Sequence, residues 1–214
     1  GVVPLGGPLL GNASLLKGVP GQDLDGYRRK EITQLQTTFT HFFDQVMGAS
    51  RLTLVGEVGM TYVGGLESKS KVRYGRDPVF GPGTLPNGAC PALNNSTAQG
   101  AGLPNANGLN TICNNDVFTT ATSWGYRGRA IWEYPDVFAG VNLKPNVAWS
   151  HDVKGYSPGP GGNFEEGRKA VSLGLDAEYQ NTYTASLNYT NFFGGDFSTV
   201  DDRDFVALSV GVNF

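Results

Sequence analysis

Six charged residues stand at alternating positions in segments that otherwise carry mostly apolar or small side chains, so they could share one surface. They are Glu57, Arg127, Arg129, Lys144, Asp176 and Glu178. Such a set could shape the electrostatic field of a pore or bind an anionic group. The simpler interpretation is ion pairing between neighbouring strands, which fills and rigidifies an enclosed polar surface. We favour this interpretation, because mixed charge is usual on such surfaces.

Two acidic clusters could supply oxygen ligands to a cation. They are His151-Asp152 and the run at residues 201–204. Neither has the spacing of a calcium-binding loop, so ordinary turn chemistry is the better interpretation. The only histidines are His41 and His151, and neither lies near both cysteines, so we expect no metal centre and no cofactor. The sequence has no nucleophile elbow, phosphate loop or HExxH motif, and we expect no enzymatic activity.

The two cysteines, Cys90 and Cys113, lie in one stretch rich in Gly, Asn and Pro. They are too far apart for a CxxC redox or zinc motif. We predict a disulfide that staples a surface loop, which implies an oxidising compartment. Closing such a loop contributes about 3 kcal/mol in the chain-entropy model. Two free thiols are the alternative, which is less favoured because the loop offers little core to bury them.

The elements that position these residues are predicted by a period of two. At residues 203–214, apolar side chains at every second position alternate with small or polar ones, which indicates a strand. Similar alternation predicts six further strands at 28–43, 52–62, 118–134, 141–150, 171–179 and 183–190. No apolar run approaches the roughly 18 residues that a spanning helix needs.

The connections between these strands alternate in length. They are short after the first, third and fifth strands and longer after the others, with the longest at 64–116. Outer-membrane barrels alternate short periplasmic turns with longer extracellular loops in this way, and carry aromatic girdles at strand ends. The candidate girdle residues are Tyr134, Trp149, Tyr179, Tyr183 and Tyr189. We therefore predict an all-β fold, a transmembrane antiparallel up-and-down barrel over 28–214, with 1–27 as an extracellular loop or lid.

Composition supports this fold class and narrows the partners. The 214 residues are 16% charged, below the quarter or so of soluble domains, and include 31 Gly. The net charge is −3 without a basic stripe, so nucleic acid is not expected as a partner. Single-chain bacterial barrels have an even strand number of about eight or more. Seven predicted strands therefore indicate the carboxyl-terminal part of a larger barrel, whose upstream portion would be a partner.

The terminal residue Phe214 lies on the apolar side of the last predicted strand. A terminal Phe in this position resembles the closing strand of bacterial outer-membrane barrels, where it is part of the signal read by the insertion machinery. We therefore expect three features: insertion into the outer membrane of a Gram-negative bacterium, contact with the bilayer, and recognition by that machinery.

Five segments together resemble an uncharacterised family of large proteobacterial outer-membrane barrel proteins. They lie at residues 123–129, 150–158, 161–170, 189–195 and 202–205. The resemblance covers nearly all of this chain but only the carboxyl-terminal part of the longer family members. Members are often encoded beside a periplasmic lipoprotein-carrier-like protein and an exporter of the resistance-nodulation-division type. The resemblance implies trans-envelope movement of a lipidic or hydrophobic molecule, and it supplies no catalytic residue.

We therefore expect an outer-membrane channel or transporter for a hydrophobic or amphiphilic solute, acting in a trans-envelope system. The alternative is a structural or adhesive surface barrel whose long loop binds an external partner. A general diffusion porin is a third and weaker hypothesis.

Overall fold

The computed structural model describes residues 29–75, 115–158 and 162–213, which divide into two compact units. The sheet unit comprises residues 34–61, 122–155 and 164–213. The loop unit comprises the other described residues. The predicted lid at 1–27 and most of the predicted loop at 64–116 lie outside the described residues.

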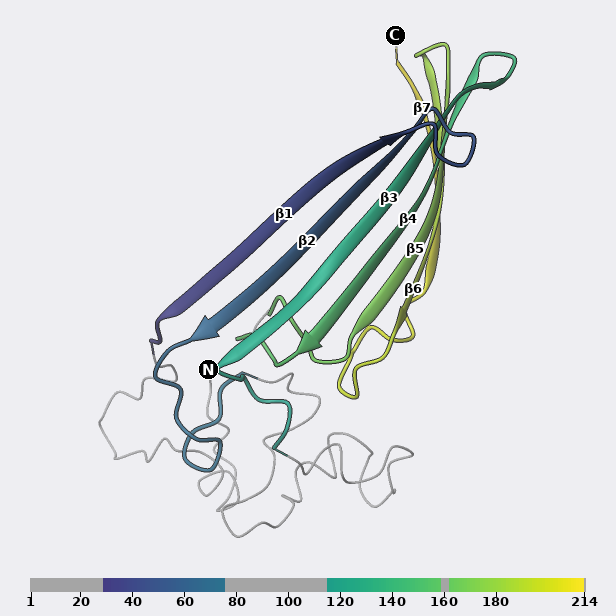
Figure 1. Ribbon diagram of the computed structural model, residues 1–214. Coiled ribbons are helices and arrows are strands. Elements are labelled where there is room, and N and C mark those ends of the chain that lie inside the picture. Colours follow the sequence, from purple (N-terminus) through teal and green to yellow (C-terminus); the bar gives the residue numbers. More distant parts are fainter. Residues whose placement is uncertain (1–28, 76–114, 159–161, 214) are drawn as a thin grey trace, which may run out of the picture. The chain divides into compact units, whose positions relative to one another are not determined.

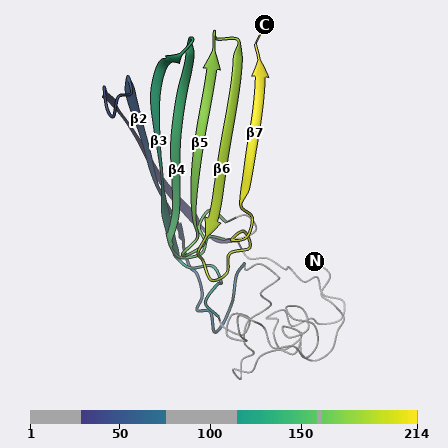
Figure 2. The same cartoon turned by 90° about the vertical axis from the view of Figure 1, so that its right-hand side faces the viewer.

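A single antiparallel sheet of seven strands contains every regular element of the described ranges, and its strands are neighbours in chain order (Figures 1 and 2). This confirms the predicted all-β class. The strands are β1 (Ile32–Asp44), β2 (Arg51–Val63), β3 (Thr122–Phe138), β4 (Val141–Lys154), β5 (Lys169–Tyr179), β6 (Tyr183–Phe193) and β7 (Phe205–Val212). All except β7, with 8 residues, reach the roughly 9–11 residues with which a strand crosses a bilayer.

Tight turns set the register of two hairpins. Gln180 and Asn181, between β5 and β6, have φ of 54° and 55°. Ala139 and Gly140, between β3 and β4, have φ of 49° and 83°. Two consecutive residues with positive φ are the signature of the type I′ turn, whose twist matches that of the flanking strands. These turns hold the strands in one register, so alternate side chains keep to one face.

The third strand differs from its predicted limits. It begins at Thr122 rather than near residue 118, and it continues through Pro135 to Phe138. Proline cannot donate to the strand ladder, and the sequence around it resembles a turn. The register of β3 against β4 shifts between Tyr134 and Phe138, and Asp136 has a positive φ of 47°. A bulge therefore accommodates the proline within the strand.

The pattern of burial on the two faces of the sheet is the inverse of that in water-soluble proteins, since large apolar side chains are exposed and several polar side chains are buried. We name one of them the apolar face: it exposes Leu35, Phe39, Val58, Leu173, Leu187, Leu208 and Val210, with Leu208 and Val210 72% and 75% exposed. The opposite face, here the polar face, carries the buried polar residues Thr61, Asn146, Asp152 and Thr190. Buried apolar residues among those described lie in connections or, like Val63, at a strand end. Water-soluble sheets show the reverse arrangement.

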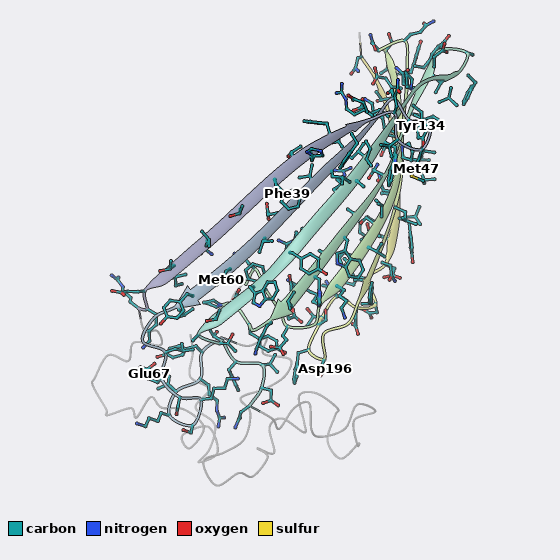
Figure 3. All side chains as sticks on the ribbon, in the orientation of Figure 1. Phe39, Met47, Met60, Glu67, Tyr134 and Asp196 are labelled. Atoms are coloured by element: carbon teal, nitrogen blue, oxygen red, sulfur yellow. The ribbon has the colours of Figure 1, made fainter. Side chains whose placement is uncertain are left out.

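The two ends of the sheet unit carry different connections (Figure 3). Met47, in the turn after β1, and Tyr134 of β3 lie at one end, where the Tyr134 hydroxyl donates to the Met47 carbonyl at 3.1 Å. Asp196 lies at the opposite end, in the longer connection between β6 and β7. The described strands form an open sheet, with β1 and β7 as its edges. Within the described residues, no helix has the length and apolarity needed to cross a membrane.

The loop unit is held by a small polar cluster. The Lys30 ammonium lies 2.8 Å from a Glu67 carboxylate oxygen and donates to the Gly65 carbonyl at 2.6 Å. The Tyr74 hydroxyl donates to Glu67 at 2.8 Å, and its ring lies 5.5 Å from the ammonium. The hydrogen bond to Glu67 raises the pKa of Lys30 above its ordinary value. The segment that leads into β1 is thereby bound to the segment that follows β2.

Candidate functional site on the polar face

Cross-strand pairing shows which of the predicted charged residues share the polar face. Lys144 of β4 is the direct partner of Asp176 of β5, and Asn142 is the partner of Glu178. Arg129 of β3 reaches the same side, since its guanidinium donates to Asn146 of β4 at 3.1 Å. Partners in an antiparallel pair point to the same side of the sheet. The predicted set therefore contributes to one continuous polar surface over these strands.

An asparagine links the central charges. Asn146 accepts the hydrogen bond of Arg129 and donates to the Asp176 carboxylate at 3.1 Å. Its Cα partner on β5 is Gly174, where a Cβ atom would lie within 2.7 Å of the Asn146 amide and 2.4 Å of the Asn188 oxygen. Only glycine leaves room for the two amides to approach across β5. Asn146 and Gly174 were not predicted as site residues from the sequence, although both occupy strand positions on the side that carries the predicted charges.

The remaining charges find partners in a similar way. Lys144 lies 3.6 Å from Glu178, with both side chains partly exposed. Glu57 of β2 accepts hydrogen bonds from Gln36 at 2.7 Å and Thr38 at 3.4 Å, both from β1. These contacts match the interpretation of the polar residues as a cross-strand network that stiffens the sheet.

Arg127 of β3 has a half-exposed side chain on the polar face. Its side chain is 50% exposed, and its ion pair with Asp152 has a length of 3.8 Å. It lines a polar-face pocket of about 280 Å³ together with Arg129 and Glu57, over a floor of small side chains. The floor consists of Ala148, Ser150, Ala170 and Ser172. Two guanidinium groups above such a floor can bind a carboxylate, sulfonate or phosphate.

Asp152 forms its shorter ion pair with Arg168, so its contact with Arg127 is long. Its side chain is 5% exposed, and its Oδ2 accepts from Arg168 Nη2 at 2.6 Å and Nε at 2.8 Å. The same oxygen accepts from the Glu165 amide at 3.2 Å. Backbone hydrogen bonds join Asp152 to Arg168 and Gly167. This clamp fixes the connection between β4 and β5 to the sheet, so the turn chemistry predicted for His151-Asp152 is wrong for Asp152.

Phe164 lies within the same connection and packs on the polar face. A Cβ atom on Gly59 of β2 would lie 3.1 Å from its ring, and one on Gly125 of β3 would also lie 3.1 Å away. The side chain is buried. The two glycines provide the flat surface that the ring covers. Phe164 therefore covers the polar face at the end opposite the tight turns, and it was not identified from the sequence.

Asp204, the last residue before β7, is held by three donors from β6. The Phe192 amide donates to its carboxylate at 2.9 Å, the Asn191 amide at 2.5 Å and the Tyr189 hydroxyl at 3.3 Å. The hydrogen bond from the Phe192 backbone amide, followed by that from the Asn191 side-chain amide, lowers the pKa of Asp204 below its ordinary value of 3.8. Of the acidic run at 201–204, this residue has a defined structural role.

We predict that Asp204→Asn lowers stability at neutral pH but not in strong acid. A lowered folded pKa contributes stability above the unfolded pKa, and this stability is lost as the pH falls through the folded value. The difference in urea midpoint between the native chain and the variant should therefore shrink below pH 3.8. Asp202→Asn, in an exposed turn, should show no such dependence. A constant difference across the pH range would contradict the proposed bonding.

Several predicted residues are not placed. Cys90, Cys113 and Phe214 lie outside the described residues, so the disulfide and the insertion signal stay predictions. His151 lies on the apolar face, where its ring contacts Tyr126 at 5.5 Å between centroids. Within residues 29–75, 115–158 and 162–213, no cluster of three or more His, Cys, Asp or Glu side chains could hold a metal ion.

Comparison with known proteins identifies one family. The profile of the family described as "Protein of unknown function (DUF1302)" matches residues 3–214, which is nearly the whole chain. We found no significant match among curated proteins and none among solved structures. The match agrees with the expectation of an uncharacterised family. The chain belongs to the DUF1302 family.

Proposed function

We propose that this chain is part of an outer-membrane β-barrel that acts as a channel or transporter for an amphiphilic anion. The inverted burial pattern carries the proposal. The apolar face of the sheet exposes large aliphatic side chains along the strands, whereas the side chains buried on the opposite face, such as Asn146 and Thr190, are polar. An exposed apolar area of this extent marks a surface that contacts lipid or protein. The alternating connection lengths and two-faced strands favour lipid, because they are typical of membrane barrels.

The pocket beneath Arg127 supports the choice of an amphiphilic anion. Arg127 and Arg129 supply positive charge, whereas Val55, Ala148 and Ala170 supply apolar contacts in the same pocket. Glu57, the acid in this pocket, is already engaged by Gln36 and Thr38. A solute with an acidic group and a hydrocarbon part would satisfy both kinds of surface. A neutral sugar would leave the arginines without a counter-charge.

The proposal places the polar face toward the barrel interior and the connection containing Phe164 at the extracellular mouth. Further strands that pair with the edges β1 and β7 would complete the barrel. In this proposal the barrel contacts the lipid bilayer and works with the other proteins of the expected trans-envelope system. Direct contact with the barrel-insertion machinery belongs to assembly rather than transport.

The proposal predicts preferential release of an entrapped aromatic sulfonate over a neutral sugar from vesicles that contain the complete barrel. Arg127→Glu should slow sulfonate release by at least about fivefold, because one charge contact at ~4 Å in water is worth about 1 kcal/mol. Sugar release should change little. Fluorescence of the released sulfonate and light scattering during sugar-driven swelling measure the two rates.

Arg203→Glu, the same charge change in an exposed turn, is the control and should leave both rates unchanged. Equal release of sulfonate and sugar, insensitive to Arg127→Glu, would instead support a general diffusion porin. The adhesive alternative would be favoured if neither solute left the vesicles although the strands were protected from protease by the bilayer.

A further inference from the structure

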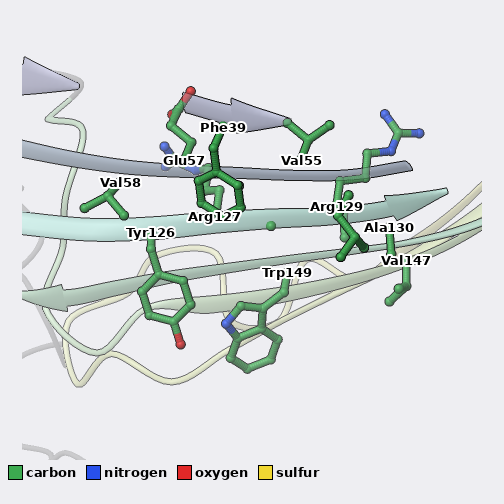
Figure 4. A pocket seen from close by; sticks show the side chains of 14 residues that line it. Phe39, Val55, Glu57, Val58, Tyr126, Arg127, Arg129, Ala130, Val147 and Trp149 are labelled. Atoms are coloured by element: carbon green, nitrogen blue, oxygen red, sulfur yellow. The ribbon is translucent and has the colours of Figure 1, made fainter. Parts of the chain in front are cut away.

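A groove crosses the apolar face on the other side of the sheet from the Arg127 pocket (Figure 4). Its volume is about 490 Å³, within the range of about 300–1,000 Å³ that is usual for ligand sites. Gly128 of β3 forms part of its floor, and Phe39, Tyr126 and Trp149 form walls. In Figure 4 the side chains of Glu57 and Arg129 point away from those of Tyr126 and Trp149. The groove therefore faces the medium that surrounds the apolar face.

The groove is deep because Gly56 and Gly128 lack a side chain on this face. Phe39 covers Gly56 of β2, where a Cβ atom would overlap with the phenyl ring. At Gly128, a Cβ atom would meet only the Val55 carbonyl, at 3.9 Å, so this position is open. Aliphatic side chains of Leu54, Val58, Ala130 and Val147 complete the lining. A groove with this lining can hold a flexible hydrocarbon chain but offers little to a polar ligand.

A cation lies beyond the aromatic end of the groove. The Trp149 ring lies 6.5 Å from the ring of His151, the next residue on the same face of β4. Lys169 of β5 is the direct partner of both His151 and Phe193, so it shares this face. Among the described residues, Lys169 forms no ion pair. Asp204, which reaches this side of β6, is occupied by the three donors described above.

Aromatic rings beside a lysine form the pattern that anchors proteins at a membrane–water boundary. The Trp149 ring also lies 5.9 Å from that of Phe193, so the cluster extends from β4 to β6. It stands near the end of the sheet where the longer connections lie. The apolar groove, the aromatic rings and the Lys169 ammonium follow one another along this face. An anionic lipid has the same order of groups, with an acyl chain at one end and a charged headgroup at the other.

We propose that the groove and Lys169 form a binding site for one anionic, phosphate-bearing lipid of the surrounding bilayer. One acyl chain occupies the groove above Gly128, and the phosphate lies near Lys169. The inference rests on the proposed membrane location of the apolar face. It is separate from the solute pocket, since the two sites lie on opposite faces of the same strands.

Quenching of Trp149 by brominated lipids tests this site. We would use the chain with Trp124→Phe and Trp132→Phe, reconstituted in phosphatidylcholine vesicles that contain brominated phosphatidylglycerol or brominated phosphatidylcholine. We expect phosphatidylglycerol to be preferred about fivefold at the site, the factor that one lysine near an anionic lipid surface provides. Lys169→Gln should abolish the preference. Gly128→Leu should fill the groove and lower quenching by both lipids.

Ala185→Leu is the control, since it creates the same leucine side chain on the apolar face outside the groove, where Ala185 pairs with Ala177. It should leave quenching unchanged. Equal quenching by both lipids in the parent chain, unaffected by Gly128→Leu, would show ordinary annular lipid and overturn the site. Absence of quenching by either lipid would overturn the membrane location as well.

Discussion

In the proposed barrel, Leu187→Arg should lower the free energy of unfolding in a phospholipid bilayer by about 2–4 kcal/mol, the cost of a charge on the lipid side of a barrel at mid-depth. Leu187 is 49% exposed at the centre of β6, between its direct partners Leu175 and Leu208. No acid among these partners could neutralise the guanidinium. Urea unfolding of the chain in phosphatidylcholine vesicles, followed by tryptophan emission, measures the effect.

The adjacent Ser186→Arg provides the control for this substitution. Ser186 points to the polar face and is the direct partner of Asp176, so the new guanidinium would face a carboxylate. We expect a change of less than about 1 kcal/mol, the usual range for an ion pair in contact with water. Equal losses from the two variants would contradict the assignment of the two faces to lipid and water.

Asp152→Ala should be the most damaging single change on the polar face, with a cost of about 3–5 kcal/mol. The side chain is 5% exposed and accepts two short hydrogen bonds from Arg168 and one from the Glu165 amide. Its removal takes away the shortest ion pair of the partly buried Arg168 guanidinium and leaves only the pair with Glu165 at 3.2 Å, which is costly because the arginine cannot be neutralised. Urea unfolding in the same vesicles measures the loss.

Glu178→Gln is the comparison for this prediction. It also breaks an ion pair on the polar face, but the pair with Lys144 is longer and more exposed. We expect a loss below about 1 kcal/mol. The double variant Asp152→Leu, Arg168→Met should recover part of the stability, since it removes both charges. If Asp152→Ala cost no more than Glu178→Gln, the clamp would not stabilise the connection.

The strands were predictable because the faces of this sheet differ in polarity along most of its width. Leu208 and Val210 alternate with Ser209 and Gly211, and this pattern persists in β5 and β6, whose cores were found within a few residues of their limits. The alternation of apolar and polar residues does not show at which residue the hydrogen bonding between two strands ends. Pro135 resembles a terminator, yet a bulge continues β3 to Phe138, because the tight turn that follows needs the strand in register.

The candidate site was predictable only in part. Charged residues such as Lys144 and Glu178 could be placed on one face by counting along their strands. Asp152 could not be distinguished from a solvated turn residue, because its burial depends on Arg168, which reaches it only after the connection folds back. Phe164 gave no periodic signal, since it lies in a connection and its packing surface comes from glycines on β2 and β3.

The odd number of strands in this sheet determines how its two edges can be joined. Because all neighbours are antiparallel, β1 and β7 run in the same direction. Joining these two edges directly, within one chain or between copies that enter the bilayer with the same orientation, would create a parallel pair, whose slanted hydrogen bonds are slightly weaker. An antiparallel closure requires an odd number of inserted strands, whatever their source. The number of strands inserted between β7 and β1, and not the total strand number, therefore decides whether the closed sheet contains a parallel pair.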